Sequence, residues 1–239
     1  MTKVALFIFL LFTSLNTFAQ NTLPAFTTEA NAFFKKFVTD GKVAYAAVKK
    51  DAKSIQALTS KIGSMNLAEA PDNSKKAFYI NAYNLLVIKA VTDLYPLQTV
   101  MAKPGFFDKT LHQVAGEQLT LNDLEKKKLL EPYRDARLHF VLVCAAVSCP
   151  NLASFAYTPE QINTQLDNRT KLALNNPAFI RVNTSKQQVL ISKIFDWYKS
   201  DFLKNTPTAL AYINTYRQNK IPETYQLGYY EYDWNLNKK

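Results

Sequence analysis

The chain's two cysteines and one of its two histidines lie within eleven positions of each other, from His139 to Cys149. A thiol close to a histidine is typical of a cysteine nucleophile, whereas two thiols so near in sequence can also form a disulfide. Three interpretations are open: a Cys144–Cys149 disulfide, a cysteine activated by His139 or His112, and two small buried thiols. An even cysteine count favours the disulfide if the protein is exported.

The element that carries these residues is predicted to be a strand over residues 138–144, which alternate in side-chain character and are rich in β-branched and aromatic residues. In a regular strand His139 and Cys144 point to opposite faces, so they cannot touch. A bulge, or a strand that ends before Cys144, removes this objection.

A second group of polar residues lies in the long apolar stretch that begins at Ser74, a plausible helix cap, and ends at Pro96. Its apolar character on nearly every side predicts a helix in the centre of the core. Asn81 and Asn84 are one turn apart on this helix and therefore share a face. Either their amides hydrogen-bond the backbone of a neighbouring loop, such as the turn 145–150, or they donate to a substrate.

The remaining elements are predicted from local signals. Thr120 and Asp123 form a capping box, and Asp196 lies in an aromatic helix where it could orient a histidine. Helices are expected at residues 28–40, 53–65, 120–130, 158–175, 193–204 and 207–218, hairpins at 110–120 and 179–192, and an extended aromatic tail after them. The fold class is therefore α+β: a helix-rich single domain around a small, mostly antiparallel sheet.

The N-terminus has the pattern of a secretory signal peptide, with Lys3 before an apolar run and small residues near a cleavage site between Ala19 and Gln20. We expect residues 1–19 to be removed and the mature chain to be periplasmic or secreted, with no transmembrane segment. The mature chain divides into an N-terminal helical region, residues 20–69, and a domain over residues 70–236.

The formal net charge of +10 comes mostly from scattered lysines, of which Lys126, Lys127 and Lys128 are the only triple. This distribution predicts a solvated basic surface with weak contact to anionic surfaces, and no specific nucleic-acid site. Two cysteines and two histidines at these spacings predict no metal site. No cofactor is expected.

Six stretches occur in an order that resembles the domain-of-unknown-function family 547, in its exported bacterial form. They are FYINAYNLLVIKAV, VAGEQLTLNDLE, ARLHFVLVCAAVSCPNL, YTPEQINTQLDNRT, ISKIFDWYKSDF and YDWNLN, and they span about residues 70–236. The resemblance implies that Asn81, Tyr83, Asn84, His139 and Cys144 fall on characteristic positions, and that Cys149 marks the bacterial version of the turn. It also suggests a distant likeness to papain and transglutaminase folds.

These observations lead to two main hypotheses about function, and a third is a structural envelope protein with no small ligand and no pocket near Cys144. In the first, an exported domain binds a ligand or envelope partner in a pocket between the central helix, the strand end at Cys144 and the turn 145–150, with Asn81, Tyr83, Asn84 and Cys149 as binding residues. In the second, the protein is a thiol-dependent hydrolase or acyl transferase that uses Cys144 with His139 or His112.

Overall fold

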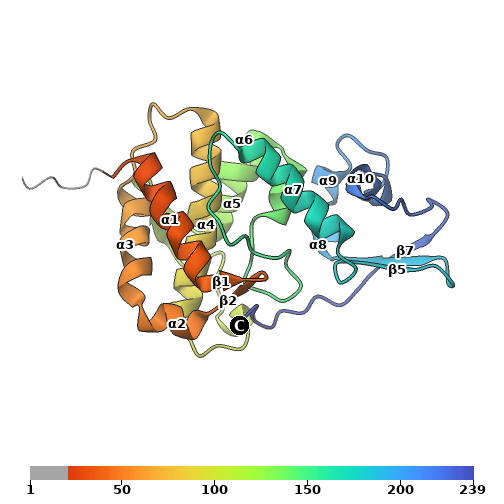
Figure 1. Ribbon diagram of the computed structural model, residues 1–239, viewed down its shortest axis with the longest axis horizontal. Coiled ribbons are helices and arrows are strands. Elements are labelled where there is room, and N and C mark those ends of the chain that lie inside the picture. The colour runs from red at the N-terminus through yellow and green to blue at the C-terminus, as the bar shows by residue number, and fades with distance from the viewer. Residues whose placement is uncertain (1–20) are drawn as a thin grey trace, which may run out of the picture.

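The apolar stretch after Pro71 forms α4 (Asp72–Leu94), the longest helix of the computed structural model, which describes residues 21–239 (Figure 1). Every residue from Ile80 to Ile88 is buried, as expected of a helix at the centre of a core. The predicted cap at Ser74 is wrong, because the helix begins two residues earlier, after Pro71. The predicted signal peptide, residues 1–19, lies outside the described residues.

The N-terminal helices α1 (Leu23–Phe37), α2 (Tyr45–Lys50) and α3 (Ala52–Ser64) share one hydrophobic cluster with α4. Two of them correspond to the predicted helices, whereas α2 was not predicted. Between α1 and α2, the short strands β1 (Val38–Thr39) and β2 (Lys42–Val43) pair in an antiparallel hairpin.

The second hairpin and the capping box agree with the sequence. Strands β3 (His112–Val114) and β4 (Glu117–Leu119) pair in an antiparallel register around Ala115 and Gly116. The Thr120 hydroxyl accepts the Asp123 N–H at 3.0 Å and starts α5 (Leu121–Glu125). This helix continues through a π-helical turn, η2 (Lys126–Leu130), into α6 (Glu131–Tyr133).

The predicted strand at residues 138–144 is wrong. The segment forms a 3-10 helix, η3 (Ala136–Phe140), followed by irregular backbone through Cys144. Residues 138–143 are all buried, with Phe140 in one hydrophobic cluster and Leu138 and Val141 in the other. Because this segment is buried on both sides, its side chains are as apolar as those of a buried strand, although its backbone is irregular.

The C-terminal part is built on α7 (Ile162–Asn175) and a three-stranded sheet. Helix α7 ends where expected but begins four residues after Thr158, which does not cap it. Strands β5 (Ile180–Asn183) and β6 (Gln188–Ile191) form the predicted antiparallel hairpin, and β7 (Gln226–Tyr229) adds to β6 in parallel. The helices between them are α8 (Ile194–Trp197), α9 (Lys199–Phe202) and α10 (Ala209–Tyr216).

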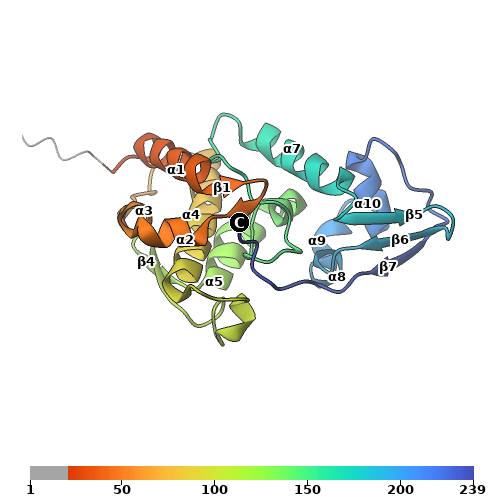
Figure 2. The same cartoon turned by 60° about the horizontal axis from the view of Figure 1, so that its bottom comes forward.

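The predicted α+β class is confirmed: helices dominate, and the strands form two hairpins and one three-stranded sheet. A short 3-10 helix, η1 (Val100–Ala102), follows α4. After β7 the chain returns along the molecule, as Figure 2 shows, and a bridge between Val43 and Lys238 places its end beside β2. Bridges join this tail to distant segments, including Ala146 to Leu236 and Val43 to Lys238. The tail therefore links the part of the molecule that contains the sheet to the helical part around α4.

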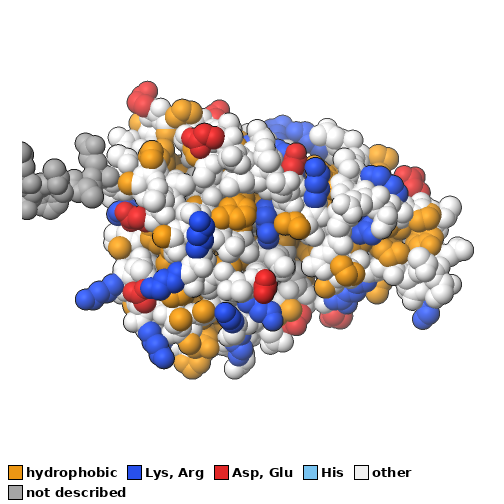
Figure 3. Space-filling view, in the orientation of Figure 1, with side chains coloured by type: hydrophobic (Ala, Val, Ile, Leu, Met, Phe, Trp, Pro, Cys, Tyr) orange, Lys and Arg blue, Asp and Glu red, His pale blue; other side chains and the backbone are white. Residues whose placement is uncertain are grey.

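Lysine and arginine side chains are spread over the face shown in Figure 3 among neutral groups. Within residues 21–239, no helix is both long and apolar enough to cross a membrane.

Candidate functional site

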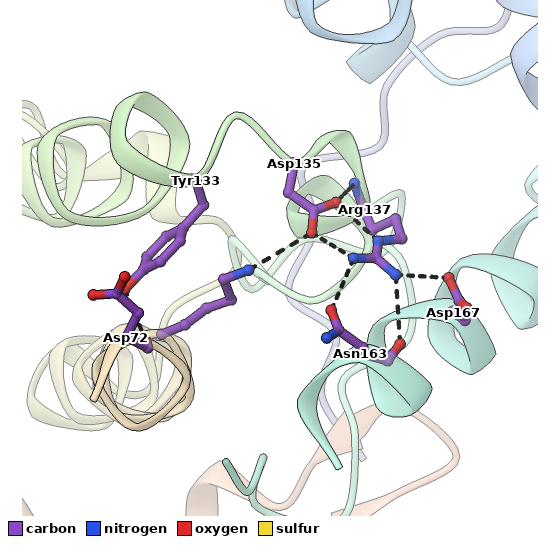
Figure 4. A network of polar contacts seen from close by, with 7 residues as sticks. Asp72, Tyr133, Asp135, Arg137, Asn163 and Asp167 are labelled. Carbon is purple, nitrogen blue, oxygen red and sulfur yellow. Dashed lines mark hydrogen bonds and ion pairs between the residues drawn. The ribbon is translucent and has the colours of Figure 1, made fainter. Parts of the chain in front are cut away.

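An ionic network fixes the segment that carries His139. The Arg137 guanidinium donates to Asp135 at 2.7 and 2.9 Å and, across to α7, to Asp167 at 2.8 Å and the Asn163 side chain at 3.2 Å (Figure 4). Lys76 of α4 lies 3.9 Å from Asp135. Burial raises the pKa of Asp135, but the hydrogen bonds from Arg137 outweigh this and hold the pKa below its usual value. The network thus joins η3 to both α7 and α4.

His139 is buried and paired with a carboxylate. Its Nε2 lies 2.8 Å from Oδ2 of Asp201, which is on α9. The hydrogen bond from His139 lowers the pKa of Asp201. The imidazole ring packs on Tyr198 and Phe202, with centroid distances of 4.1 and 5.2 Å. The pair has the geometry of a histidine that an acidic residue orients.

The two asparagines of α4 hold the irregular backbone on either side of the cysteines. The Asn84 amide donates to the Val141 carbonyl at 2.9 Å and accepts the Val143 N–H at 3.0 Å. In the same way, Asn81 donates to the carbonyl and accepts the N–H of Tyr157, both at 2.9 Å. The loop-binding interpretation of the amides is confirmed, but the contacts are to Val141, Val143 and Tyr157 rather than to the turn 145–150.

Cys144 and Cys149 form a disulfide, with their Cα atoms 6.4 Å apart. The first of the three interpretations of the cysteines therefore describes this structure. The hydroxyl of Tyr232, in the returning tail, lies 3.3 Å from Sγ of Cys144 and 3.1 Å from Sγ of Cys149. The backbone N–H of Cys144 also donates to Sγ of Cys149 at 3.1 Å.

A cavity of about 170 Å³ lies beside the disulfide, and His139 also lines it. Trp197 and Trp234, the two tryptophans of the chain, both face this cavity. The other lining residues are Tyr83, Phe107, Asn122, Glu125, Leu142, Ile194, Tyr198 and Tyr232. The walls are thus aromatic, with a small number of polar groups among them, which is the usual composition of a small-molecule site.

Glu125 contributes a carboxylate to this cavity. Its Oε1 accepts the Tyr198 hydroxyl at 2.7 Å. Burial raises the pKa of Tyr198 and of Tyr83, and the negative charge of Glu125 raises both further. Both phenols therefore remain protonated at neutral pH, and Tyr198 donates its single hydroxyl hydrogen to Glu125.

Four of the six predicted site residues line this cavity: Tyr83, His139, Cys144 and Cys149. Asn81 and Asn84 lie behind it, with their amides bonded to backbone groups.

The other residues considered from the sequence lie elsewhere. His112 lines a separate hollow beside Lys89 and Asp93, where burial lowers its pKa. Asp196, considered as a carboxylate that orients a histidine, lies 3.5 Å from Lys193 instead. The carboxylate beside His139 belongs to Asp201.

Several residues of the site were not predicted. Asp201 and Glu125 are ordinary surface-like acidic residues in sequence, and nothing in their spacing distinguishes them. Tyr232 and Trp234 carry a weak signal, because they alternate along an extended segment and therefore share a face. Among residues 21–239, no group of three or more histidine, cysteine, aspartate or glutamate side chains is placed to hold a metal ion.

Comparison with known proteins finds a similarity to one family over part of the chain. No curated protein and no solved structure matches the chain. A family model described as "Protein of unknown function, DUF547" matches residues 67–172, which include α4, η3, His139 and both cysteines. The matched region ends before Asp201 and the C-terminal tail. Residues 67–172 are thus similar to this family, whose function is unknown.

Proposed function

We propose that this protein binds a small ligand in the cavity between α4, the Cys144–Cys149 disulfide and the returning tail. The observation that carries the proposal is the composition of the cavity. Aromatic rings from four separate parts of the chain surround a carboxylate, an amide and phenol hydroxyls. A site with apolar walls and a few convergent polar groups is the usual form of a small-molecule pocket.

The size and chemistry of the cavity limit the ligand. Its volume of about 170 Å³ is close to that of an engineered cavity of about 150 Å³ that holds benzene, so one six-membered ring fits. Trp197 and Trp234 offer apolar faces to such a ring, while Glu125 and Asn122 offer an acceptor and an amide. We therefore propose a neutral, ring-sized ligand with one apolar face and a hydrogen-bond donor for Glu125.

The experiment uses the fact that the intrinsic tryptophan signal comes entirely from this cavity. The oxidised protein is titrated with a panel of monosaccharides and small neutral aromatic compounds, and binding is followed by tryptophan fluorescence and calorimetry. Glu125→Gln keeps the shape but replaces one acceptor oxygen by an amide donor, so we expect affinity to fall about tenfold or more. Glu117→Gln, which removes a surface charge, is the matched control.

Binding that is unchanged in Glu125→Gln, or equally weakened in Glu117→Gln, would contradict this assignment. No binding by any member of the panel would contradict the proposed ligand class.

The signal-peptide pattern supports the further proposal that the protein is exported, and the disulfide is compatible with an oxidising compartment. N-terminal sequencing of protein recovered from the producing cells tests it. A mature chain that begins near Gln20 is the expected result, and an intact Met1 in the recovered protein would overturn it.

A second candidate function is a thiol hydrolase or acyl transferase. It is favoured by His139, which lines the same cavity as Cys144 and is paired with Asp201. This activity requires a reduced protein, because a sulfur in a disulfide has no thiolate to attack with. If it is correct, the reduced protein should show fast alkylation of Cys144 by iodoacetamide at pH 6, and His139→Gln should slow this reaction. Slow alkylation in both proteins would rule it out.

A further inference from the structure

The two sulfurs of the disulfide have different surroundings. Cys149 is 7% exposed, and its Sγ receives the N–H of Cys144 at 3.1 Å. The Tyr232 hydroxyl, which has a hydrogen to donate, also lies 3.1 Å from this sulfur. Cys144 is only partly buried and faces the aromatic cavity. Both cysteines line this cavity and the Tyr232 hydroxyl also lies 3.3 Å from Sγ of Cys144, so the two sulfurs differ in the hydrogen bond from the Cys144 N–H to Cys149 and in the greater exposure of Cys144.

The turn between the cysteines is also held by the tail, independently of the disulfide. The N–H groups of Val147 and Ser148 donate to tail carbonyls at 2.8 and 3.2 Å, and the Ala145 carbonyl accepts the Asn237 N–H at 2.9 Å. The Ser148 hydroxyl accepts the Asp233 N–H at 2.9 Å. A disulfide that closes so short a loop constrains the unfolded chain little. The fold around the site should therefore persist when the disulfide is reduced.

We propose that the Cys144–Cys149 disulfide is a redox centre that exchanges with small thiols entering the aromatic cavity, and that Cys144 is the sulfur they attack. The substrate class is a low-molecular-weight thiol. This proposal concerns the sulfurs and does not depend on the neutral ligand proposed above, because that ligand is tested on oxidised protein without any thiol.

The exchange takes place in two balanced steps. A small thiol loses its proton, and its thiolate attacks Sγ of Cys144 and forms a mixed disulfide. The Cys144–Cys149 bond breaks, and its electron pair remains on Cys149 as a thiolate, which the Cys144 N–H and the Tyr232 hydroxyl stabilise. A second thiol then attacks the mixed disulfide at the small-molecule sulfur. This attack releases a small disulfide and leaves Cys144 reduced.

The direction of attack follows from the leaving group. Thiol–disulfide exchange is faster when the departing sulfur has the lower pKa, and hydrogen-bond donors lower the pKa of a thiol by favouring its charged form. The Cys144 N–H donates to Cys149, and the Tyr232 hydroxyl lies slightly closer to Cys149, at 3.1 Å, than to Cys144, at 3.3 Å. Attack on Cys144 therefore releases the better leaving group.

The test treats the folded, oxidised protein with 2-mercaptoethanol, quenches samples with acid and an alkylating agent, and maps the products by mass spectrometry. We expect a mixed disulfide on Cys144 and a rate of reduction that rises in proportion to thiol concentration. Tyr232→Phe removes one donor and should slow reduction by about 3- to 10-fold. Tyr229→Phe, in the same C-terminal segment, should leave the rate unchanged.

Circular dichroism of Tyr232→Phe establishes that this variant is folded. If it does not fold, the Cys149→Ser variant replaces it: oxidised 2-mercaptoethanol should then form a stable mixed disulfide on its Cys144.

Three outcomes would overturn the proposal: a mixed disulfide on Cys149 in the wild type, equal rates in the two tyrosine variants, or reduction limited by global unfolding and independent of thiol concentration. Failure of ligand binding by the oxidised protein leaves all these measurements unaffected, so the two proposals can be tested separately.

Discussion

Asn84 provides the sharpest test of how α4 holds the irregular backbone before the cysteines. Asn84→Leu preserves the size of the side chain but removes both hydrogen bonds, to the Val141 carbonyl and from the Val143 N–H. Both backbone groups then remain buried without partners, since Val141 and Val143 are 1% and 3% exposed. Each unpaired group costs about 1–3 kcal/mol, and a buried leucine offsets about 1.5–3 kcal/mol of the total.

We therefore expect Asn84→Leu to lower the free energy of unfolding by about 1–3 kcal/mol, a substantial part of the usual 5–15 kcal/mol for a domain. Urea denaturation followed by circular dichroism, with the disulfide intact, measures the change. Asn73→Leu is the matched control, because Asn73 lies on the same helix and is exposed. Its effect should stay within about 0.5 kcal/mol. Equal losses in the two variants would refute the assigned role of Asn84.

Three further substitutions test other parts of the account. Gly41→Ala should destabilise the protein by more than about 1–2 kcal/mol. Gly41 has a φ of +78°, and a Cβ there would lie 2.6 Å from the Asn151 side chain. Thermal unfolding of the two proteins measures the loss of stability. Arg137→Met should cost about 1–3 kcal/mol in urea denaturation, because it leaves partly buried carboxylates unpaired. His139 holds the pKa of Asp201 below its usual value. The ionised Asp201 carboxylate beside His139 therefore stabilises the folded protein above about pH 4, and this stabilisation is lost as the pH falls below about 4. Wild type and Asp201→Asn should thus differ in stability at about pH 5 and converge as the pH falls below about 4.

Local signals in the sequence predicted local structure well. The hairpin around Gly116 and the capping box at Thr120 depend on a few adjacent residues, and both are present. The segment 138–144 was mispredicted because its burial comes from two separate hydrophobic clusters, and apolar composition alone does not distinguish a buried strand from buried irregular backbone. The hydrogen bonds that satisfy this backbone come from Asn84, far away in sequence.

His139 and the two cysteines were singled out by their types and their closeness in sequence, and Tyr83 by the family resemblance; all four line the cavity. Long-range packing of α9 places Asp201 beside His139, and the returning tail brings Tyr232 into the cavity. Such contacts depend on topology, which no local pattern of residues specifies.

The central claim is that the aromatic cavity beside the disulfide is where this protein binds its ligand. Crystals of the oxidised protein soaked in a library of neutral ring-sized fragments test it most directly. We predict fragment density against Trp197 and Trp234, with a hydrogen bond to Glu125. A cavity that stays free of fragments, while they occupy the separate cleft beside Arg169 and Arg181, would contradict the claim.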